Sequence, residues 1–181
     1  GNDYGGRVGI FNTIGETGVV KNLKVYHSEI KGGAVGAVAG VNKGTIQNVY
    51  TFGNKIESSG VAIIPNRETN DCLGAAGGVA GINTGKIIDS DSNNIVIAGH
   101  IGDTPTASSI AGGVTGLNVG HIQYAVSDSA ITSSSNANSL GGIAGVSTSS
   151  DAQYEANAND NPNDDIPFAS IESVESYGIV N

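Results

Sequence analysis

The hydrophobic and polar residues of this chain follow one pattern that returns several times. Its clearest copy spans Gly77–Ile87 and consists of Gly-Gly-Val-Ala-Gly-Ile-Asn-Thr-Gly-Lys-Ile. Further copies begin at Gly36 and Gly112, and a fourth, which loses the pattern early, begins at Gly141. The shared form is Gly-(Gly or Ala)-apolar-small-Gly-apolar-Asn-x-Gly-x-Ile. Internal repetition of this kind predicts stacked units, because one such unit is too small to bury its own apolar face.

The spacing of apolar residues within each unit predicts β-strands. Ile56 lies ten residues after Ile46, and Ile97 lies ten residues after Ile87. No segment keeps apolar residues at i, i+3, i+4 and i+7 over ten residues, which a helix would need. Glycine, which is frequent here, also costs about 1 kcal/mol per helix position. We therefore expect two or three short strands per unit and little or no helix, with residues 1–31 forming a divergent first unit.

A recurring Asn-x-Gly tripeptide predicts a tight turn in each unit. Asparagine tolerates a left-handed backbone and glycine adopts it freely, so both suit a turn between strands. If each unit is one coil of a solenoid, equivalent residues stack about 4.8 Å apart and the asparagines form a hydrogen-bonded ladder. The predicted ladder and turn residues are Asn42, Asn83, Asn118, Gly44, Gly85 and Gly120.

Three segments interrupt the repeat, at about 57–76, 100–110 and 147–168. The number of residues between equivalent glycines differs from one copy of the repeat to the next. Coils of constant size would give equal numbers, so the excess residues must form loops. The sequence therefore predicts an all-β, single-domain β-solenoid, or parallel β-helix, over residues 1–181, with four to five repeats and three looped insertions. The chain opens in the middle of a pattern and without Met, so we expect it to belong to a longer polypeptide with neighbouring domains.

Composition supports a thin core and narrows the class of partner. Charged residues make up 14% of the chain, against about 25% in an average protein, and Trp is absent. The net charge of −9 disfavours nucleic acid, which is bound by clustered Lys and Arg. No apolar run approaches 18 residues, so we expect no membrane insertion. Cys72 is the single cysteine, and no motif marks it as a nucleophile.

The repeat resembles the GLUG repeat, which is named for Gly-Leu-any-Gly. Val or Ile stands here where that name has Leu, and the resemblance covers most of the chain outside the insertions. The matching tetrapeptides are Gly78-Val79-Ala80-Gly81, Gly113-Val114-Thr115-Gly116 and Gly142-Ile143-Ala144-Gly145. The resemblance implies a β-solenoid at a bacterial cell surface or in a secreted virulence protein, as in filamentous adhesins and immunoglobulin A1 proteases. It implies no catalytic residues.

The third predicted insertion is rich in carboxylates. Its acidic candidates for a binding loop are Asp151, Glu155, Asp160, Asp164 and Asp165. Oxygen ligands at this density are compatible with Ca²⁺, which takes six to eight of them, and Asp160, Asp164 and Asp165 are the candidate ligands. The spacing does not match an EF-hand. A solvated acidic loop is the alternative interpretation.

Asp89 and Asp91 form a second acidic pair. Residues i and i+2 of a strand point to the same face, so both carboxylates are able to meet one ligand. Paired carboxylates serve as acid and base in enzymes that act on polysaccharides. Asp89, however, shares its predicted column with Asn22 and Asn48, which indicates an exposed polar strand instead.

These observations leave three functions open. The first is a non-catalytic structural or display module, whose inserted loops contact a host protein or a glycan. The second is a β-helix polysaccharide lyase or hydrolase that uses Asp89 and Asp91, for which Tyr50, Tyr124 and Lys24 are the nearest substrate-binding candidates. The third is an accessory domain of a secreted protease. The scattered histidines make no zinc motif and no nucleophile elbow is present, so we expect no enzyme activity.

Overall fold

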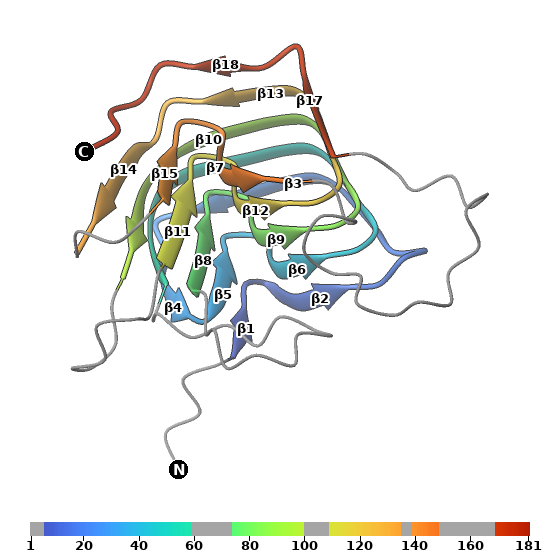
Figure 1. The fold of residues 1–181 in the computed structure, drawn as a ribbon. Helices are drawn as coiled ribbons and strands as arrows, with labels where there is room; N and C mark the ends of the chain where they lie inside the picture. The colour runs from blue at the N-terminus through green and yellow to red at the C-terminus, as the bar shows by residue number, and fades with distance from the viewer. Residues whose placement is uncertain (1–5, 59–73, 100–108, 135–138, 149–168) are drawn as a thin grey trace, which may run out of the picture.

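The computed structural model describes residues 6–58, 74–99, 109–134, 139–148 and 169–181. Within these ranges all regular elements are β-strands and none is a helix, as the sequence predicts. The strands pair in parallel in three sheets that wind around a common axis (Figure 1). Successive strands of the chain pass from one sheet to the next, so each coil adds one layer to all three. The all-β solenoid predicted from the repeat is thus confirmed.

The three sheets are named here in the order in which the chain enters them. The first sheet contains β1 (Arg7–Val8), β5 (Ala34–Gly36), β8 (Gly74–Gly77), β11 (Ser109–Gly112) and β15 (Ser139–Gly141). The second contains β2 (Phe11–Ile14), β6 (Ala39–Asn42), β9 (Ala80–Asn83), β12 (Thr115–Asn118) and β16 (Ala144–Ser147). The third contains β3 (Val19–Tyr26), β4 (Glu29–Gly32), β7 (Thr45–Ser58), β10 (Lys86–Ala98), β13 (His121–Ser127), β14 (Ala130–Ser133), β17 (Ser170–Glu172) and β18 (Glu175–Ser176).

We number the coils 1 to 5, beginning at β1, β5, β8, β11 and β15. Equivalent residues of the repeat are paired across coils, as the sequence pattern requires. Ile46, Ile87, Ile122 and Ile171 are paired in one column of the third sheet. The third-sheet strands of coils 2 and 3 are the long ones, with a register shift between Asn93 and Ile95. This in-register stacking is what brings residues far apart in sequence into contact.

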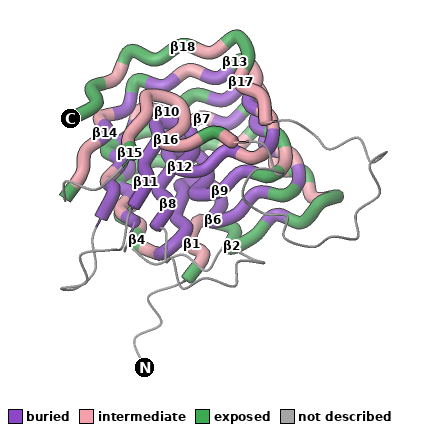
Figure 2. The backbone as a smooth tube through the Cα atoms, in the orientation of Figure 1, coloured by how far each residue is buried: buried purple, intermediate pink, exposed green. Residues whose placement is uncertain are grey.

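The solenoid interior is filled with β-branched and small residues. The main apolar cluster includes the column of isoleucines and the corner valines Val38, Val79 and Val114. A second, smaller cluster contains Ala34 and Val41 with their counterparts in coils 3 and 4. Neighbouring residues of a strand point to opposite faces, and Ala34 and Val35 belong to different clusters, so β5 is buried on both faces. The strands of the first and second sheets in coils 2 to 4 are buried in the same way (Figure 2).

The turn glycines are required for a reason other than the one predicted. We expected the Asn-x-Gly turns to use left-handed backbone, but no residue of these turns has a positive φ. A Cβ on Gly85 would instead lie 2.6 Å from the carbonyl carbon of Lys43 in the coil below. Left-handed backbone occurs in a column of the third sheet, at Asn22, Asn48, Asp89, Tyr124 and Ser173.

The strands extend into the ranges predicted as insertions. β7 runs to Ser58, β8 begins at Gly74, and β11 begins at Ser109. The interiors of those ranges lie outside the described residues. No helix in the described ranges is long and apolar enough to cross a membrane.

Candidate functional site

The structure places Asp89 and Asp91 on the outer surface of the third sheet, on β10. Both are exposed, and Asp91 is paired with Tyr50 of the neighbouring coil. Asp89 has a φ of 50°, so the regular alternation of an extended strand does not hold at this residue. Asp89 and Asp91 nevertheless lie exposed on either side of buried Ser90, so the hypothesis that both carboxylates meet one ligand stays a prediction.

The acidic residues of the third predicted insertion lie outside the described residues. These are Asp151, Glu155, Asp160, Asp164 and Asp165. In the part of the chain that is described, no three His, Cys, Asp or Glu side chains gather as a metal ion would need. The Ca²⁺ hypothesis for Asp160, Asp164 and Asp165 therefore stays a prediction.

The asparagine ladder is a chain of buried side-chain hydrogen bonds. Nδ2 of Asn42 donates to Oδ1 of Asn83 at 2.8 Å, and Nδ2 of Asn83 donates to Oδ1 of Asn118 at 2.9 Å. Asn118 then donates to the hydroxyl of Ser147 at 3.2 Å, which ends the ladder in coil 5. All three asparagines are fully buried. Their amides hold adjacent coils together and are not available to a ligand.

A second buried polar cluster lies inside the third sheet and was missed from the sequence. Nδ2 of Asn94 donates to the hydroxyls of Thr51 at 2.8 Å and Ser92 at 2.9 Å. Its Oδ1 accepts from Nδ2 of Asn54 at 2.8 Å, and its backbone N–H donates to Ser129 Oγ at 3.1 Å. A sequence signal existed, because Asn54, Asn94 and Ser129 each stand two residues before a buried apolar residue. No buried side-chain nitrogen or oxygen in the described ranges lacks a partner.

The outer face of the same sheet carries a cluster of aromatic rings, which we call the aromatic shelf. It consists of Tyr26 and His27 from coil 1 and Tyr50 and Phe52 from coil 2. The rings of Tyr50 and Phe52 are 8° from parallel, with centroids 6.2 Å apart. Tyr26 meets both rings at steep angles, with centroid distances of 6.0 and 6.5 Å. The shelf forms because Tyr26 is paired with Phe52 across β3 and β7.

Polar residues continue the shelf along the solenoid axis. Asp91 is paired with Tyr50, and Asn93 is paired with Phe52. In coil 4, Asp128 lies beside Asn93, whose Nδ2 donates to Asp128 Oδ2 at 3.3 Å. We call the six residues Tyr26, Tyr50, Phe52, Asp91, Asn93 and Asp128 the outer stripe. It combines exposed rings with hydrogen-bonding groups on one continuous surface.

Gly53 holds one side of the shelf in place. Its φ is +66°, a conformation that other residues rarely adopt. A Cβ on Gly53 would also lie 2.8 Å from Nδ1 of His27. The missing side chain leaves room for the His27 ring, which meets Phe52 edge to face at a centroid distance of 5.7 Å.

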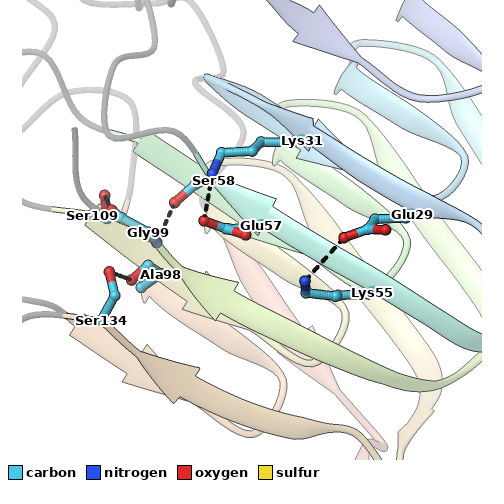
Figure 3. A network of polar contacts seen from close by, with 9 residues as sticks. All are labelled: Glu29, Lys31, Lys55, Glu57, Ser58, Ala98, Gly99, Ser109 and Ser134. Carbon is cyan, nitrogen blue, oxygen red and sulfur yellow. Dashed lines mark hydrogen bonds and ion pairs between the residues drawn. The ribbon is translucent and has the colours of Figure 1, made fainter.

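Two ion pairs lie on the third sheet between coils 1 and 2 (Figure 3). Nζ of Lys55 is 2.9 Å from Oε1 of Glu29, and Nζ of Lys31 is 2.7 Å from Oε1 of Glu57. The hydrogen bond from Lys55, aided by its charge, lowers the pKa of Glu29, and the same contact raises the pKa of Lys55. Both pairs are solvent-exposed, so we assign them a minor structural role.

A shallow hollow of about 230 Å³ lies near the start of the third-sheet strands of coils 3 to 5. It is lined by Lys86, Ile88, His121, Gln123, Ser170 and Glu172. Nδ1 of His121 lies 2.7 Å from Ser170 Oγ. Among the described residues no carboxylate forms an ion pair with His121. The aromatic shelf is the stronger candidate for recognition.

Comparison of the chain with protein-family models, with curated proteins and with solved structures found no match. Function must therefore be inferred from the chemistry and placement of the residues themselves.

Proposed function

We propose that this chain is a non-catalytic structural and display module of a bacterial surface or secreted protein. In this proposal the solenoid is a rigid support, and the loops inserted between its coils contact a host protein or a glycan. The resemblance to GLUG repeats belongs to the same proposal, since those repeats occur in large extracellular proteins. The position of the segments that interrupt the repeat supports this proposed function.

The observation that carries the proposal is the common origin of three connections. Segments 59–73, 100–108 and 135–138 each join a third-sheet strand to the next first-sheet strand. β7, β10 and β14 are neighbours in the third sheet, and β8, β11 and β15 are neighbours in the first sheet. The three connections therefore start and end at one corner of consecutive coils. Segment 149–168 departs from a different corner, between the second and third sheets.

Hydrogen bonds tie the ends of these connections to one another (Figure 3). The N–H of Gly99 donates to Ser58 Oγ at 3.0 Å, which links the exits of coils 2 and 3. The hydroxyl of Ser109 donates to the carbonyl of Gly99, which closes the base of segment 100–108. In coil 4, the N–H of Ser134 donates to the carbonyl of Ala98 at 3.0 Å. A corner anchored in this way is suited to presenting loops from a fixed base.

Coil 1 shows how the corner closes when no loop is inserted. Gly33 alone joins β4 to β5. Gly32 is paired with Ser58, and Ala34 is paired with Ala75. Gly33 of coil 1 therefore corresponds to Gly74 of coil 2. Removing 59–73 would join Ser58 directly to Gly74, as Gly32 is joined to Gly33 in coil 1. Removing 99–108 would likewise join Ala98 to Ser109. Both deletions should leave the coils stacked, since loop length affects stability only weakly, although the second also removes the two hydrogen bonds of Gly99.

The test is adhesion of the wild-type chain and of both deletion variants to surfaces coated with mucin or with fibronectin. We expect the wild-type chain to bind one of these surfaces and each deletion to weaken binding while the urea midpoint stays within a small shift. A variant with Gly and Ser throughout 59–73 controls for loop length. Failure of the wild-type chain to bind either surface, or full binding after both deletions, would contradict the proposal.

A further inference from the structure

The outer stripe is not explained by the packing of the solenoid. Tyr26 is 45% exposed and Phe52 is 37% exposed, although buried positions are available on the inner face of the same strands. A structural aromatic ladder would continue from coil to coil. Here the column of Tyr50 continues as Asp91 and Val126, and the column of Phe52 continues as Asn93. The change from rings to carboxylates and amides at coil 3 divides the stripe into two chemically distinct halves.

We propose that the outer stripe binds a neutral glycan that lies along the solenoid axis. This site is separate from the corner that carries the inserted loops, and it does not depend on them. The glycan class we infer has pyranose rings with mostly equatorial hydroxyls, of which β-linked glucans are the simplest example. Two features of the stripe support this choice of ligand, the geometry of its rings and the sign of its charges.

The rings of the shelf suit the apolar faces of such sugars. When the hydroxyls are equatorial, the C–H bonds of a pyranose gather on its two faces. Aromatic faces carry partial negative charge and attract these weakly positive C–H groups. Tyr50 and Phe52 present two nearly parallel rings, and Tyr26 stands at an angle to both. The shelf thus offers exposed aromatic surface on two adjacent strands.

The polar half of the stripe suits the edges of the same sugars. The carboxylates of Asp91 and Asp128 accept hydrogen bonds from sugar hydroxyls, and Asn93 both donates and accepts. Hydrogen bonds to charged groups are stronger than those between neutral groups, so the carboxylates fix orientation well. From Tyr26 in coil 1 to Asp128 in coil 4 the stripe extends about 14 Å, given ~4.8 Å between paired strands. That length covers more than one sugar ring.

Charge selects against acidic glycans. Asp91 and Asp128 place negative charge beside the shelf, and the whole chain carries a net charge of −9. Lys24 is paired with Tyr50 and is the lysine beside the shelf, so it offsets part of this negative charge. Uronic and sialic acid residues would meet repulsion here, whereas uncharged sugars would not.

The test is an NMR titration of the full chain with cellohexaose, a neutral β-glucan, and in parallel with an oligogalacturonate of the same length. Cellohexaose should shift Tyr and Phe side-chain resonances and saturate, while the acidic sugar should bind more weakly. Tyr50→Ala and Phe52→Ala should each lower the association constant by about tenfold, and Asp91→Asn by about threefold. Phe52→Leu, which keeps apolar bulk without a ring, should lose nearly as much affinity as Phe52→Ala.

Tyr124→Asn is the matched control, because Tyr124 is a 53% exposed tyrosine on the same sheet but outside the stripe. It should bind cellohexaose as the wild-type chain does, and so should the 59–73 deletion variant. Retained sugar binding in that deletion, with lost adhesion, would separate this site from the proposed loop function. The proposal is overturned if cellohexaose shows no saturable binding at millimolar concentration or if Tyr50→Ala binds normally. Preference for oligogalacturonate would also overturn it, as would self-association of the chain that Tyr50→Ala abolishes.

Discussion

The two faces of the third sheet carry opposite kinds of residue in unexpected places. On β7, half-buried Tyr50 and exposed Phe52 flank Thr51, which is buried. On β10, Asp91 lies on the exposed outer face, whereas Asn94 is buried in a hydrogen-bonded cluster. At these positions, in a mainly apolar interior, polar side chains lie inside the solenoid and aromatic ones lie outside it, against the usual distribution.

The difference between the faces assigns them different roles. Every buried side-chain nitrogen and oxygen of the described residues is paired, because an unpaired one would destabilise the fold. Those residues hold coils together and cannot turn outward to meet a ligand. The rings outside contact one another and leave much of their surface to solvent, so stacking of the coils does not require them. Substitutions inside should change stability, and substitutions outside should change recognition.

The largest expected effect comes from Asn94→Ala. It would leave the buried backbone N–H of Asn54 without its acceptor, Asn94 Oδ1. It would also remove one of the two hydrogen-bond partners of the Asn54 amide, the Thr51 hydroxyl and the Ser92 hydroxyl. Since each buried unpaired group costs about 1 to 3 kcal/mol, we expect the free energy of unfolding to fall by about 3 kcal/mol or more. Urea unfolding followed by far-UV circular dichroism measures this. Asn93→Ala, one residue away on the outer face, is the control and should change stability by less than about 0.5 kcal/mol. Equal effects of the two variants would show that the faces do not differ as described.

The asparagine ladder gives a smaller and graded effect. Asn83→Leu removes the partner of both Asn42 and Asn118 and should destabilise the fold by about 2 to 3 kcal/mol. Asn83→Ser should lose less, because coil 5 already uses Ser147 at this position of the ladder. Thermal unfolding of the two variants measures the ranking. If Asn83→Leu were as stable as the wild-type chain, the ladder would not be what joins coils 2 to 4.

Tyr124 should allow a stabilising substitution on the outer face. Its φ is 53°, and the same column has Asn22 and Asn48 at this backbone conformation. Left-handed backbone costs most residues about 1 kcal/mol, whereas asparagine tolerates it. Tyr124→Asn should therefore raise the unfolding free energy by about 0.5 to 1 kcal/mol. A loss of stability in chemical denaturation would mean that the Tyr124 side chain makes a stabilising contact.

The smallest effect concerns the exposed ion pair between Glu29 and Lys55. Because the folded-state pKa of Glu29 is lowered, its contribution to stability is present above its ordinary pKa and is lost as the pH falls through the lowered value. Lys55→Met should return the pKa of Glu29 toward its ordinary value, as followed by NMR of the carboxyl carbon. Lys43→Met, on another part of the surface, should leave it unchanged. An unchanged Glu29 titration in Lys55→Met would show that the pair does not form in solution.

Much of the scaffold could be predicted from the repeat alone. The alignment of Asn42, Asn83 and Asn118 in sequence was enough to predict their stacking, because parallel in-register coils repeat every contact. The contact between Asn54 and Asn94 does not follow from the repeat, because both residues lie at the register shift of the third sheet. The left-handed backbone at Asp89 was also missed, since its column contains residues as different as Asn22 and Tyr124.

The aromatic shelf could not be predicted from sequence distance. From the sequence, Tyr50 is a substrate-binding candidate together with Tyr124 and Lys24, which lie elsewhere on the sheet surface or carry no ring. Its partners, Tyr26 and Phe52, meet it only after coil 1 stacks on coil 2 in the register that pairs Tyr26 with Phe52. The glycine at position 53, which makes room for His27, is likewise meaningful only once that pairing is known.

The most direct test compares urea unfolding of the wild-type chain and of Phe52→Ala, each with and without cellohexaose. Without the sugar the two proteins should unfold at nearly the same urea concentration, because Phe52 lies outside the core. At about ten times its dissociation constant, the sugar should stabilise the wild-type chain by about 1.4 kcal/mol and Phe52→Ala by much less. A large loss of stability in Phe52→Ala without sugar, or equal stabilisation of both proteins by sugar, would contradict the division between a structural inner face and a binding outer face.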